Sequence, residues 1–235
     1  MRGVYGRRTL LEDLAELLLG GRTVLLYGPM GSGKSAILEA LVRVMEVHRR
    51  PCGFSQRTQS LSDITGALLA AYPEVPRRGR AQREIRSALT LAIEAEPGAL
   101  LLDHLGDPGT QFKGFLRFLR GNGLGVLMAA DVEVPRDHER LRAMRLAYQE
   151  IEVPPLPSRT MHRILADVLS GDPLPFALQH AEKSALMRIA RGCAGWIVMA
   201  SRLLRDAHYW RDGRIRKESL RAEIMSQIMG RYVAW

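Results

Sequence analysis

The feature that most constrains this chain is the run GPMGSGKS over residues 28–35. It matches the phosphate-binding pattern G-x-x-x-x-G-K-[ST] at every required position. An apolar run over 23–27 precedes it and predicts a buried strand, and apolar residues at helical spacing over 36–45 follow it. A glycine loop between strand and helix points backbone N–H groups at an anion, and the helix N-terminus adds partial positive charge. The sequence therefore predicts a nucleotide-binding site rather than a structural glycine turn.

Each residue of this loop has an expected place around the nucleotide. Lys34 is expected to reach the β- and γ-phosphates, and the Ser35 hydroxyl is expected to hold Mg²⁺. No guanine-reading N-K-x-D pattern occurs in the chain, so ATP is the expected nucleotide. The other residues expected to contact the phosphates are Gly28, Pro29, Met30, Gly31, Ser32, Gly33 and Ala36.

Strand and helix signals alternate over residues 1–157. Strands are expected at 23–27, 51–54, 99–102, 125–131 and 150–153, with helices between them. The alternation predicts an α/β fold, a P-loop NTPase core whose five-stranded parallel sheet is sandwiched by helices. Thr9-Leu10-Leu11-Glu12 is a capping-box pattern, and Ser60-Leu61-Ser62-Asp63 supplies cap residues for a helix that begins near Ser60.

Beyond Pro157 the pattern becomes purely helical. It predicts a small all-helical second domain over 158–235, appended to the core domain over 1–157. The helices are expected near 158–169, 176–191, 196–209 and 217–231.

Two acids end predicted strands. Asp103 closes the apolar run at 99–102 and fits a Walker-B position that binds Mg²⁺ through water, the alternative being an acid that caps a loop. Asp131 closes the next strand. Because the carboxyl ends of parallel strands face the ligand crevice, Asp131 could face the γ-phosphate or the attacking water, or be a solvated turn residue.

The chain is strongly basic, with a formal net charge of +9 and a pI near 10.1. A basic balance suits phosphate-rich partners such as nucleic acid, with double-stranded DNA as one candidate, but it also arises from a preference for arginine codons. Two patches are candidate phosphate contacts, or else solvated faces. The first is Arg77, Arg78, Arg80 and Arg83, and the second is Lys113, Arg117 and Arg120 at helical spacing.

Several classes of protein are disfavoured. No apolar run reaches the roughly 18 residues that a membrane helix needs, so no membrane association is expected. Neither a secretory signal nor a CxxC pattern is visible, and Cys52 and Cys193 lie far apart. Reduced thiols in a cytoplasmic protein without zinc are therefore expected.

The order of these motifs resembles the AAA+ ATPases, in particular the branch of origin-recognition initiators, transposition regulators and STAND switches. Val4-Tyr5-Gly6-Arg7 looks like that family's lead-in, whose backbone and apolar residues contact adenine. GPMGSGKS resembles its Walker A, LLLD ending at Asp103 its Walker B, and Asp131 its sensor 1. Pro154-Pro155-Leu156 resembles the boundary to its helical lid, and 191–197 lies where its sensor 2 lies.

The sequence departs from that family's pattern at important positions. His104 stands where the family has the Glu that acts as general base; a neutral imidazole can accept a proton, and Asp107 or Glu133 could serve instead. Gly195-Trp196 stands in place of the sensor 2 arginine. The resemblance also implies an arginine finger supplied by a neighbouring subunit, hence a homo-oligomer, with Arg142 and Arg145 as the candidates.

Three functions are compatible with these residues. The first is an ATPase that switches conformation or assembly state and works with DNA or a DNA-bound protein machine, with Lys34, Asp103, His104 and Asp131 as its catalytic set and ATP and Mg²⁺ as its cofactors. The second is a nucleotide-binding adaptor that hydrolyses ATP slowly or not at all, acting with protein partners. The third, a small-molecule kinase, lacks the usual lid inserted within the sheet.

Overall fold

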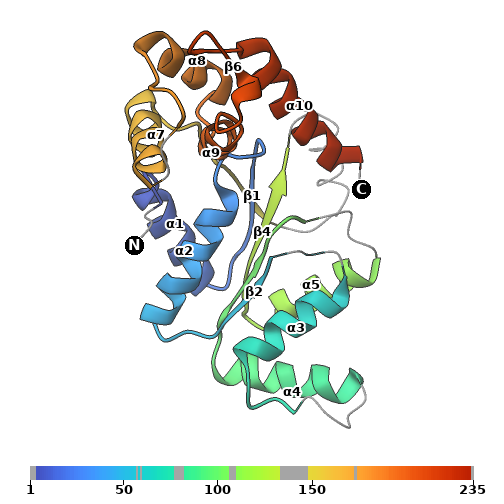
Figure 1. Cartoon of the computed structure of the whole chain (residues 1–235). Coiled ribbons are helices and arrows are strands. Elements are labelled where there is room, and N and C mark those ends of the chain that lie inside the picture. Colours follow the sequence, from blue (N-terminus) through green and yellow to red (C-terminus); the bar gives the residue numbers. More distant parts are fainter. Residues whose placement is uncertain are drawn as a thin grey trace. The chain divides into compact units, whose positions relative to one another are not determined.

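The computed structural model of the chain describes residues 4–56, 58, 60–76, 82–105, 110–132, 148–171 and 174–233. Its contacts divide the chain into two compact units (Figure 1). The first comprises residues 1–28 and 34–153, and the second comprises 29–33 and 154–235. The middle of the phosphate loop therefore belongs, by its contacts, to the second unit.

A five-stranded parallel sheet forms the centre of the first unit, as the sequence predicts. The strand order is β2-β3-β4-β1-β5, which places β1 between β4 and β5. Every residue of β3 is buried, as expected for a strand covered on both faces. The strands are β1 (Thr23–Gly28), β2 (Cys52–Ser55), β3 (Ala99–Leu102), β4 (Gly125–Asp131) and β5 (Gln149–Glu152).

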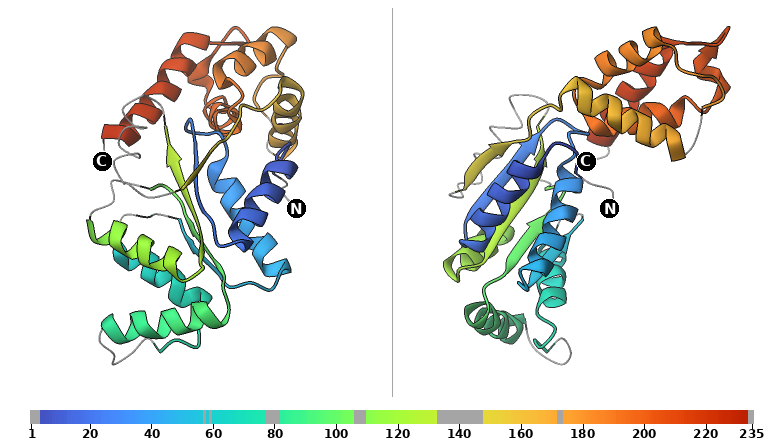
Figure 2. Two further views of the ribbon diagram at one scale, coloured as in Figure 1. Left: turned by 180° about the vertical axis from the view of Figure 1, so that it is seen from behind. Right: turned by 90° about the vertical axis from the view of Figure 1, so that its left-hand side faces the viewer.

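Helices cover both faces of this sheet, and alternate strand residues divide between them (Figure 2). On β1, Val24 and Leu26 pack with α1 (Arg8–Leu19) and α2 (Lys34–Val47), whereas Leu25 faces the other apolar cluster. The helices of that cluster are α3 (Leu61–Ala71), α4 (Gln82–Ala95) and α5 (Thr110–Gly121). The period-2 alternation of β1 therefore builds two cores, and the sheet is held rigidly between them.

Helix α1 approaches the sheet closely at the start of β4. A Cβ atom placed on Gly125 would lie 2.2 Å from the backbone oxygen of Leu18 and 2.9 Å from its Cα. Only a residue without a side chain allows this approach. Gly125 therefore fixes how closely α1 covers β4.

The second unit contains four helices and one two-stranded sheet among its described residues. Its helical character is as expected, but the sequence pattern predicted a helix through to residue 209 and no strand. Instead α9 ends at Leu203, and a 3-10 turn (Ala207–Tyr209) leads into an antiparallel hairpin. The elements are α7 (Ser158–Gly171), α8 (His180–Ala190), α9 (Ala194–Leu203), β6 (Trp210–Arg211), β7 (Arg214–Ile215) and α10 (Lys217–Val233). Among the described helices of both units, none has the length and apolar character needed to cross a lipid bilayer.

Two ionisable groups are buried in the first unit, and their burial should make its stability fall at alkaline pH. Burial, and secondarily the Glu46 carboxylate, raises the pKa of the Cys52 thiol to about 12. Burial, and secondarily the Glu96 carboxylate, raises the pKa of Tyr72 to about 12, and its hydroxyl donates a hydrogen bond to the Glu96 backbone oxygen at 3.1 Å. In the unfolded chain these groups lose their protons near pH 8.5 and 10.

We therefore expect stability to be complete below about pH 8.5 and to fall progressively as the pH rises towards 12, because the unfolded state releases protons that the folded state keeps. Urea unfolding followed across this range measures the effect. A Cys52→Ala/Tyr72→Phe variant should lose stability less steeply than the wild type. Parallel losses in the two proteins would show that other groups cause the alkaline sensitivity.

Candidate nucleotide-binding site

The phosphate loop joins the end of β1 at Gly28 to the start of α2 at Lys34. Gly31 and Gly33 have φ angles of +78° and +97°, a conformation that L side chains rarely adopt. Within the loop, the Ser32 N–H donates a hydrogen bond to the Pro29 oxygen at 3.1 Å. The positive φ angles explain why the motif requires glycine at these positions. They let the backbone curl back upon itself, as it must do to surround a phosphate.

Lys34 lies at the first position of α2 and is almost fully buried, with 6% of its side chain exposed. Its ammonium group donates a hydrogen bond to the Gly28 oxygen at 2.7 Å and forms an ion pair with Asp131 Oδ1 at 2.6 Å. Asp131 reaches this position because β4 pairs with β1, with Gly28 and Asp131 in register. The pairing holds a buried cation at the carboxyl edge of the sheet.

Asp103 and His104 lie directly after β3, at the same edge of the sheet. Asp103 is 4% exposed, and its Oδ1 accepts a hydrogen bond from the His104 backbone N–H at 2.9 Å. The His104 ring stands between two carboxylates: Nε2 lies 3.8 Å from Asp103 Oδ2, and Nδ1 lies 3.9 Å from Asp131 Oδ2. His104 also has a φ of +48°, an uncommon backbone conformation that occurs at functional sites.

The structure therefore brings together the four side chains that the sequence suggests as a catalytic set: Lys34, Asp103, His104 and Asp131. They come from three neighbouring strands whose carboxyl ends meet at one edge, the edge where open α/β sheets bind ligands. The cluster supplies one cation, two carboxylates and one imidazole. This combination can bind a phosphate, orient a water molecule and accept a proton.

Comparison with known proteins places this arrangement among solved folds. No family model matches the sequence. A stretch of 77 residues is 36% identical to the iron(3+)-hydroxamate import ATP-binding protein FhuC of Bacillus subtilis, which covers 31% of this chain and 29% of FhuC. The Hsp104–ADP complex of S. cerevisiae matches 86% of this chain, with a TM-score of 0.54 and 15% identity. This chain spans only 30% of the Hsp104 chain.

Two further structures match over more of their own length. AMPPCP-bound DnaA from Aquifex aeolicus matches 95% of this chain and 68% of its own, with a TM-score of 0.54 and 15% identity. A structure described as the structural basis for katanin self-assembly matches 93% of this chain and 78% of its own, with a TM-score of 0.52 and 18% identity. The chain has the AAA+ ATPase fold. At these identities the AAA+ likeness is one of fold.

The start of α9 packs on residue 31 of the phosphate loop through a glycine and a tryptophan. The Gly195 N–H, in the first turn of α9, donates a hydrogen bond to the Gly31 oxygen at 2.8 Å. A Cβ on Gly195 would lie 2.8 Å from the Gly31 Cα, so the contact requires glycine at this position as well. Trp196 covers Gly31, and its buried indole Nε1 has no hydrogen-bond partner among the described residues.

This contact leads to a prediction about Gly31 and Trp196. A Cβ on Gly31 would lie 2.5 Å from Trp196 Cδ1, so Gly31→Ala should destabilise the protein by about 2–3 kcal/mol through the clash and the positive φ. In a Trp196→Ala background the clash is absent, so Gly31→Ala should cost only about 1 kcal/mol there, from backbone strain. Chemical unfolding of both single variants and the double variant measures the coupling. Strictly additive losses would show that Trp196 does not cover Gly31 in solution.

The site supplies part of the ligand set that a Mg²⁺ ion needs. Hydroxyl and carboxylate oxygens are ligands that Mg²⁺ accepts, and Ser35 on α2 and Asp103 beyond β3 supply one of each. No group of three His, Cys, Asp or Glu side chains able to hold a metal ion occurs in the part of the chain that the structure describes. The residues therefore fit an ion that takes its other ligands from a nucleotide and water, as Mg²⁺ does in phosphoryl-transfer sites.

The structure leaves other sequence-predicted residues apart from this cluster or outside its description. Val4 packs against the apolar core beside α1 and α2, and Tyr5 is half-buried. On α5, Lys113 is half-buried and Arg117 is exposed, and nothing is described of the Arg120 side chain. The predicted residues that lie outside the described ranges are Arg77, Arg78, Arg80, Asp107, Glu133, Arg142 and Arg145.

Proposed function

We propose that this protein binds ATP with Mg²⁺ and hydrolyses it as an AAA+-type ATPase, a molecular switch or assembly factor that works with DNA or a DNA-bound protein machine. One observation carries the proposal: Lys34 of the phosphate loop is buried against Asp131, beside Asp103 and His104, at the carboxyl edge of the sheet. A folded core alone has no need of a buried lysine and two carboxylates at this edge, because buried charges are costly unless they serve a ligand or each other.

In this proposal Lys34 exchanges its present partners for the nucleotide. Its ammonium leaves the Gly28 oxygen and Asp131 Oδ1 and pairs with the phosphates, which carry more negative charge than one carboxylate. Ser35 and Asp103 hold Mg²⁺, which neutralises charge on the phosphate oxygens when bound. Asp131, released from Lys34, and His104 then face the water that attacks the γ-phosphate, with the His104 imidazole as the proton acceptor.

The net charge of the chain and the descriptions of the similar proteins support the proposed partners. FhuC is described as an ATP-binding protein, the DnaA structure holds AMPPCP, and the katanin structure concerns self-assembly. A net charge of +9 favours a polyanionic partner. We therefore propose assembly into a homo-oligomer and contact with double-stranded DNA as parts of the same function, with Arg142 or Arg145 of one subunit completing the site of the next.

A second function is favoured by one specific feature, the histidine that replaces the expected general base. The His104 ring is 45% exposed and lies between two carboxylates, so it can hold an ion pair as readily as it can accept a proton from water. In that case the protein is a nucleotide-binding adaptor that changes partners when ATP binds, with little or no turnover.

Phosphate release from ATP separates the two functions. The assay is run at low salt, with and without double-stranded DNA, because phosphate contacts weaken steeply as salt rises. The Lys34→Ala variant gives the background. Turnover above that background, increased by DNA, supports the switch; a wild-type rate equal to that of Lys34→Ala under every condition, with ATP still bound, supports the adaptor and contradicts hydrolysis.

A further inference from the structure

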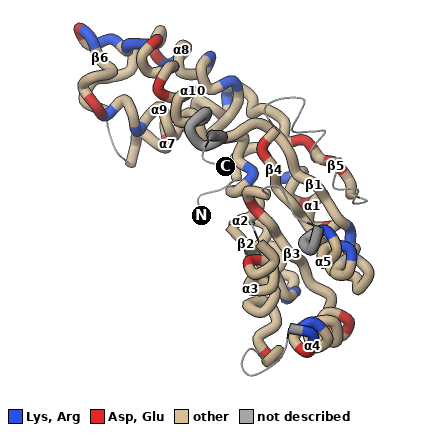
Figure 3. The backbone as a smooth tube through the Cα atoms, turned by 90° about the vertical axis from the view of Figure 1, so that its right-hand side faces the viewer, with Lys and Arg blue, Asp and Glu red and all other residues tan. Residues whose placement is uncertain are grey.

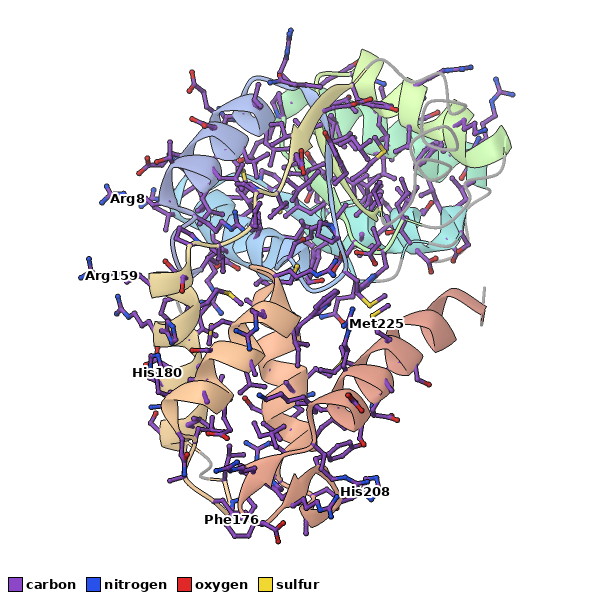
Figure 4. The ribbon with its side chains drawn as sticks, turned by 90° about the horizontal axis from the view of Figure 1, so that it is seen from above. Arg8, Arg159, Phe176, His180, His208 and Met225 are labelled. Atoms are coloured by element: carbon purple, nitrogen blue, oxygen red, sulfur yellow. The ribbon has the colours of Figure 1, made fainter. Side chains whose placement is uncertain are left out.

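The β6–β7 hairpin of the second unit is a rigid platform. Its inward residues, Trp210 and Ile215, are cross-strand partners and are 8% and 7% exposed. The Trp210 indole N–H donates a hydrogen bond to the Leu204 oxygen at 2.6 Å, and its ring packs against Phe176, with centroids 5.1 Å apart. Figure 4 labels Phe176 at this end of the second unit. A hairpin anchored this way holds its outward side chains in fixed positions.

The tight turn strengthens this rigidity. Asp212 and Gly213 both have positive φ angles, +51° and +72°. Positive φ at both central residues is the signature of a type I′ turn, the connection that best matches the twist of a two-residue hairpin.

The outward residues of the hairpin are two arginines that face each other. Arg211 and Arg214 are cross-strand partners, and both are exposed. Like charges directly opposite each other destabilise a strand pair. The neighbouring Asp212 offers little compensation: its carboxylate lies 3.9 Å from Arg211 Nε, and both side chains are more than 80% exposed. Folding of the hairpin therefore does not explain this pair of charges.

Two more cations follow at once. Arg216 and Lys217 stand at the start of α10, where the helix macrodipole is positive and acidic residues are the favourable choice. The Arg216 guanidinium donates a hydrogen bond to the His208 oxygen at 3.2 Å, which places it beside the hairpin. Figure 3 shows basic residues beside β6, and Figure 4 labels His208 at the same end of the second unit as Phe176. Four basic side chains and a helix N-terminus thus concentrate positive potential at one place.

These four cations line one open cleft of about 620 Å³, between the hairpin and the first turns of α8 and α10. Two carboxylates also line it, Glu218 and Glu182. Glu182 is 4% exposed, and one of its carboxylate oxygens has no hydrogen-bond partner among the described residues. A carboxylate in the cleft repels a small anion that enters deeply. It favours a polyanion that lies across the outer arginines instead.

The chemistry of the lining selects among polyanions. Arginine dominates, and its planar guanidinium matches phosphate oxygens in a bidentate way. None of the cleft-lining residues that the structure describes is aromatic, so the cleft offers no platform on which unpaired bases could stack. A duplex, whose bases are already stacked and whose phosphates face outward, fits these features better than a single strand.

We propose that the β6–β7 hairpin and its cleft bind the phosphate backbone of double-stranded DNA, with Arg211 and Arg214 as the main contacts and Arg216 and Lys217 beside them. Contacts of this kind position a protein on a duplex without reading its sequence. The proposal rests on the DNA part of the proposed function, adds a site to it, and is independent of ATP hydrolysis.

The test compares two charge-matched variants. Arg211→Glu/Arg214→Glu changes the hairpin, and Arg159→Glu/Arg188→Glu makes the same change in net charge on exposed residues of α7 and the last turn of α8. Figure 4 shows Arg159 at the opposite end of the second unit from Phe176. Binding of a fluorescein-labelled duplex of mixed sequence is measured by anisotropy between about 50 and 200 mM salt. Circular dichroism and binding of a labelled ATP analogue show whether each variant remains folded.

The hairpin variant should bind the duplex at least about 10-fold more weakly. A plot of the logarithm of its association constant against the logarithm of the salt concentration should have a slope shallower by about 1.8, the value for two lost phosphate contacts. The control should bind within about 3-fold of the wild type, and Arg211→Lys/Arg214→Lys should keep the wild-type salt dependence.

Three results would overturn the hairpin site. Equal weakening by both charge-reversed variants would mean that the net charge, and not the hairpin, attracts DNA. Displacement of the duplex by polyglutamate as effectively as by unlabelled duplex would mean that the site takes an acidic protein. A wild-type protein that binds the ATP analogue but no duplex would remove the DNA part of the proposed function together with this site, and would leave nucleotide binding intact.

Discussion

Replacing Lys34 by alanine should lower the affinity of this protein for ATP by about 100-fold or more, and should remove any phosphate release. Truncating one partner of a buried charge pair costs about 2–5 kcal/mol, and about 2.7 kcal/mol or more corresponds to that change in affinity. The side chain is 6% exposed and already held by two oxygen partners at 2.6 and 2.7 Å, so it enters the complex with little conformational freedom to lose. Isothermal titration with a non-hydrolysable ATP analogue measures the effect.

Lys183→Ala is the matched control, because Lys183 is an exposed lysine on α8. It should leave the affinity unchanged. Asp131→Asn tests the same ion pair from its other side: by freeing Lys34 it should preserve or tighten analogue binding while lowering turnover. If Lys34→Ala bound the analogue as tightly as the wild type, the phosphate-loop assignment would be wrong, whatever else the protein binds.

Gly125→Ala should strongly destabilise the first unit. The new Cβ would lie 2.2 Å from the Leu18 oxygen, and the atoms it meets belong to backbone that cannot rotate aside. Overpacking of this kind costs about 3 kcal/mol or more, which in a chain of this size lowers the melting temperature by about 6–12 °C. Thermal unfolding followed by far-UV circular dichroism measures the loss.

Gly114→Ala provides the opposite expectation with the same chemical change. Gly114 lies within α5, and a Cβ there would meet nothing within 4 Å. Alanine in place of glycine inside a helix should stabilise the protein by about 0.5–1 kcal/mol. If Gly125→Ala left the melting temperature unchanged or raised it, as Gly114→Ala should, the close approach of α1 to β4 would not exist in solution.

The parts of the fold that could be predicted from sequence are those whose signal is local. The phosphate loop, the buried strands and the cap residues at Ser60 each depend on residues within a few positions. Ser60 does cap α3, and Asp63 completes a full capping box there by accepting from the Ser60 N–H. The capping box expected at Thr9 was wrong. Helix α1 begins at Arg8 after Arg7, with no side-chain cap, because Arg7 is buried at 5% exposure and tertiary packing sets where the helix starts.

The hairpin of the second unit had a local signal that the helical periodicity obscured. Asp212-Gly213 is a turn pair typical of two-residue hairpins, and it is flanked by residues that alternate between buried and exposed. The strands are only two residues long, too short for alternation to compete with the apolar spacing of the neighbouring helices. For that reason Arg211 and Arg214 were not among the expected nucleic-acid contacts.

The candidate site required information that no local pattern contains. Asp103 and Asp131 were expected at strand ends, but the pairing of Asp131 with Lys34 depends on the order of the strands, which sets β4 beside β1. The contact of Gly195 with Gly31 joins segments far apart in sequence. Within each segment, the sequence shows only a glycine, which does not reveal the partner. Glycines that permit a close approach look the same in a sequence as glycines that end a helix.

The division of the chain into two units has a spectroscopic consequence. Both tryptophans that the structure describes, Trp196 and Trp210, belong to the second unit, whereas the residue range of the first unit contains tyrosine but no tryptophan. Tryptophan emission is therefore a native reporter of the second unit alone, and far-UV ellipticity reports both. A single denaturation experiment read by the two signals can show whether the units melt together or in succession, with no label added to either.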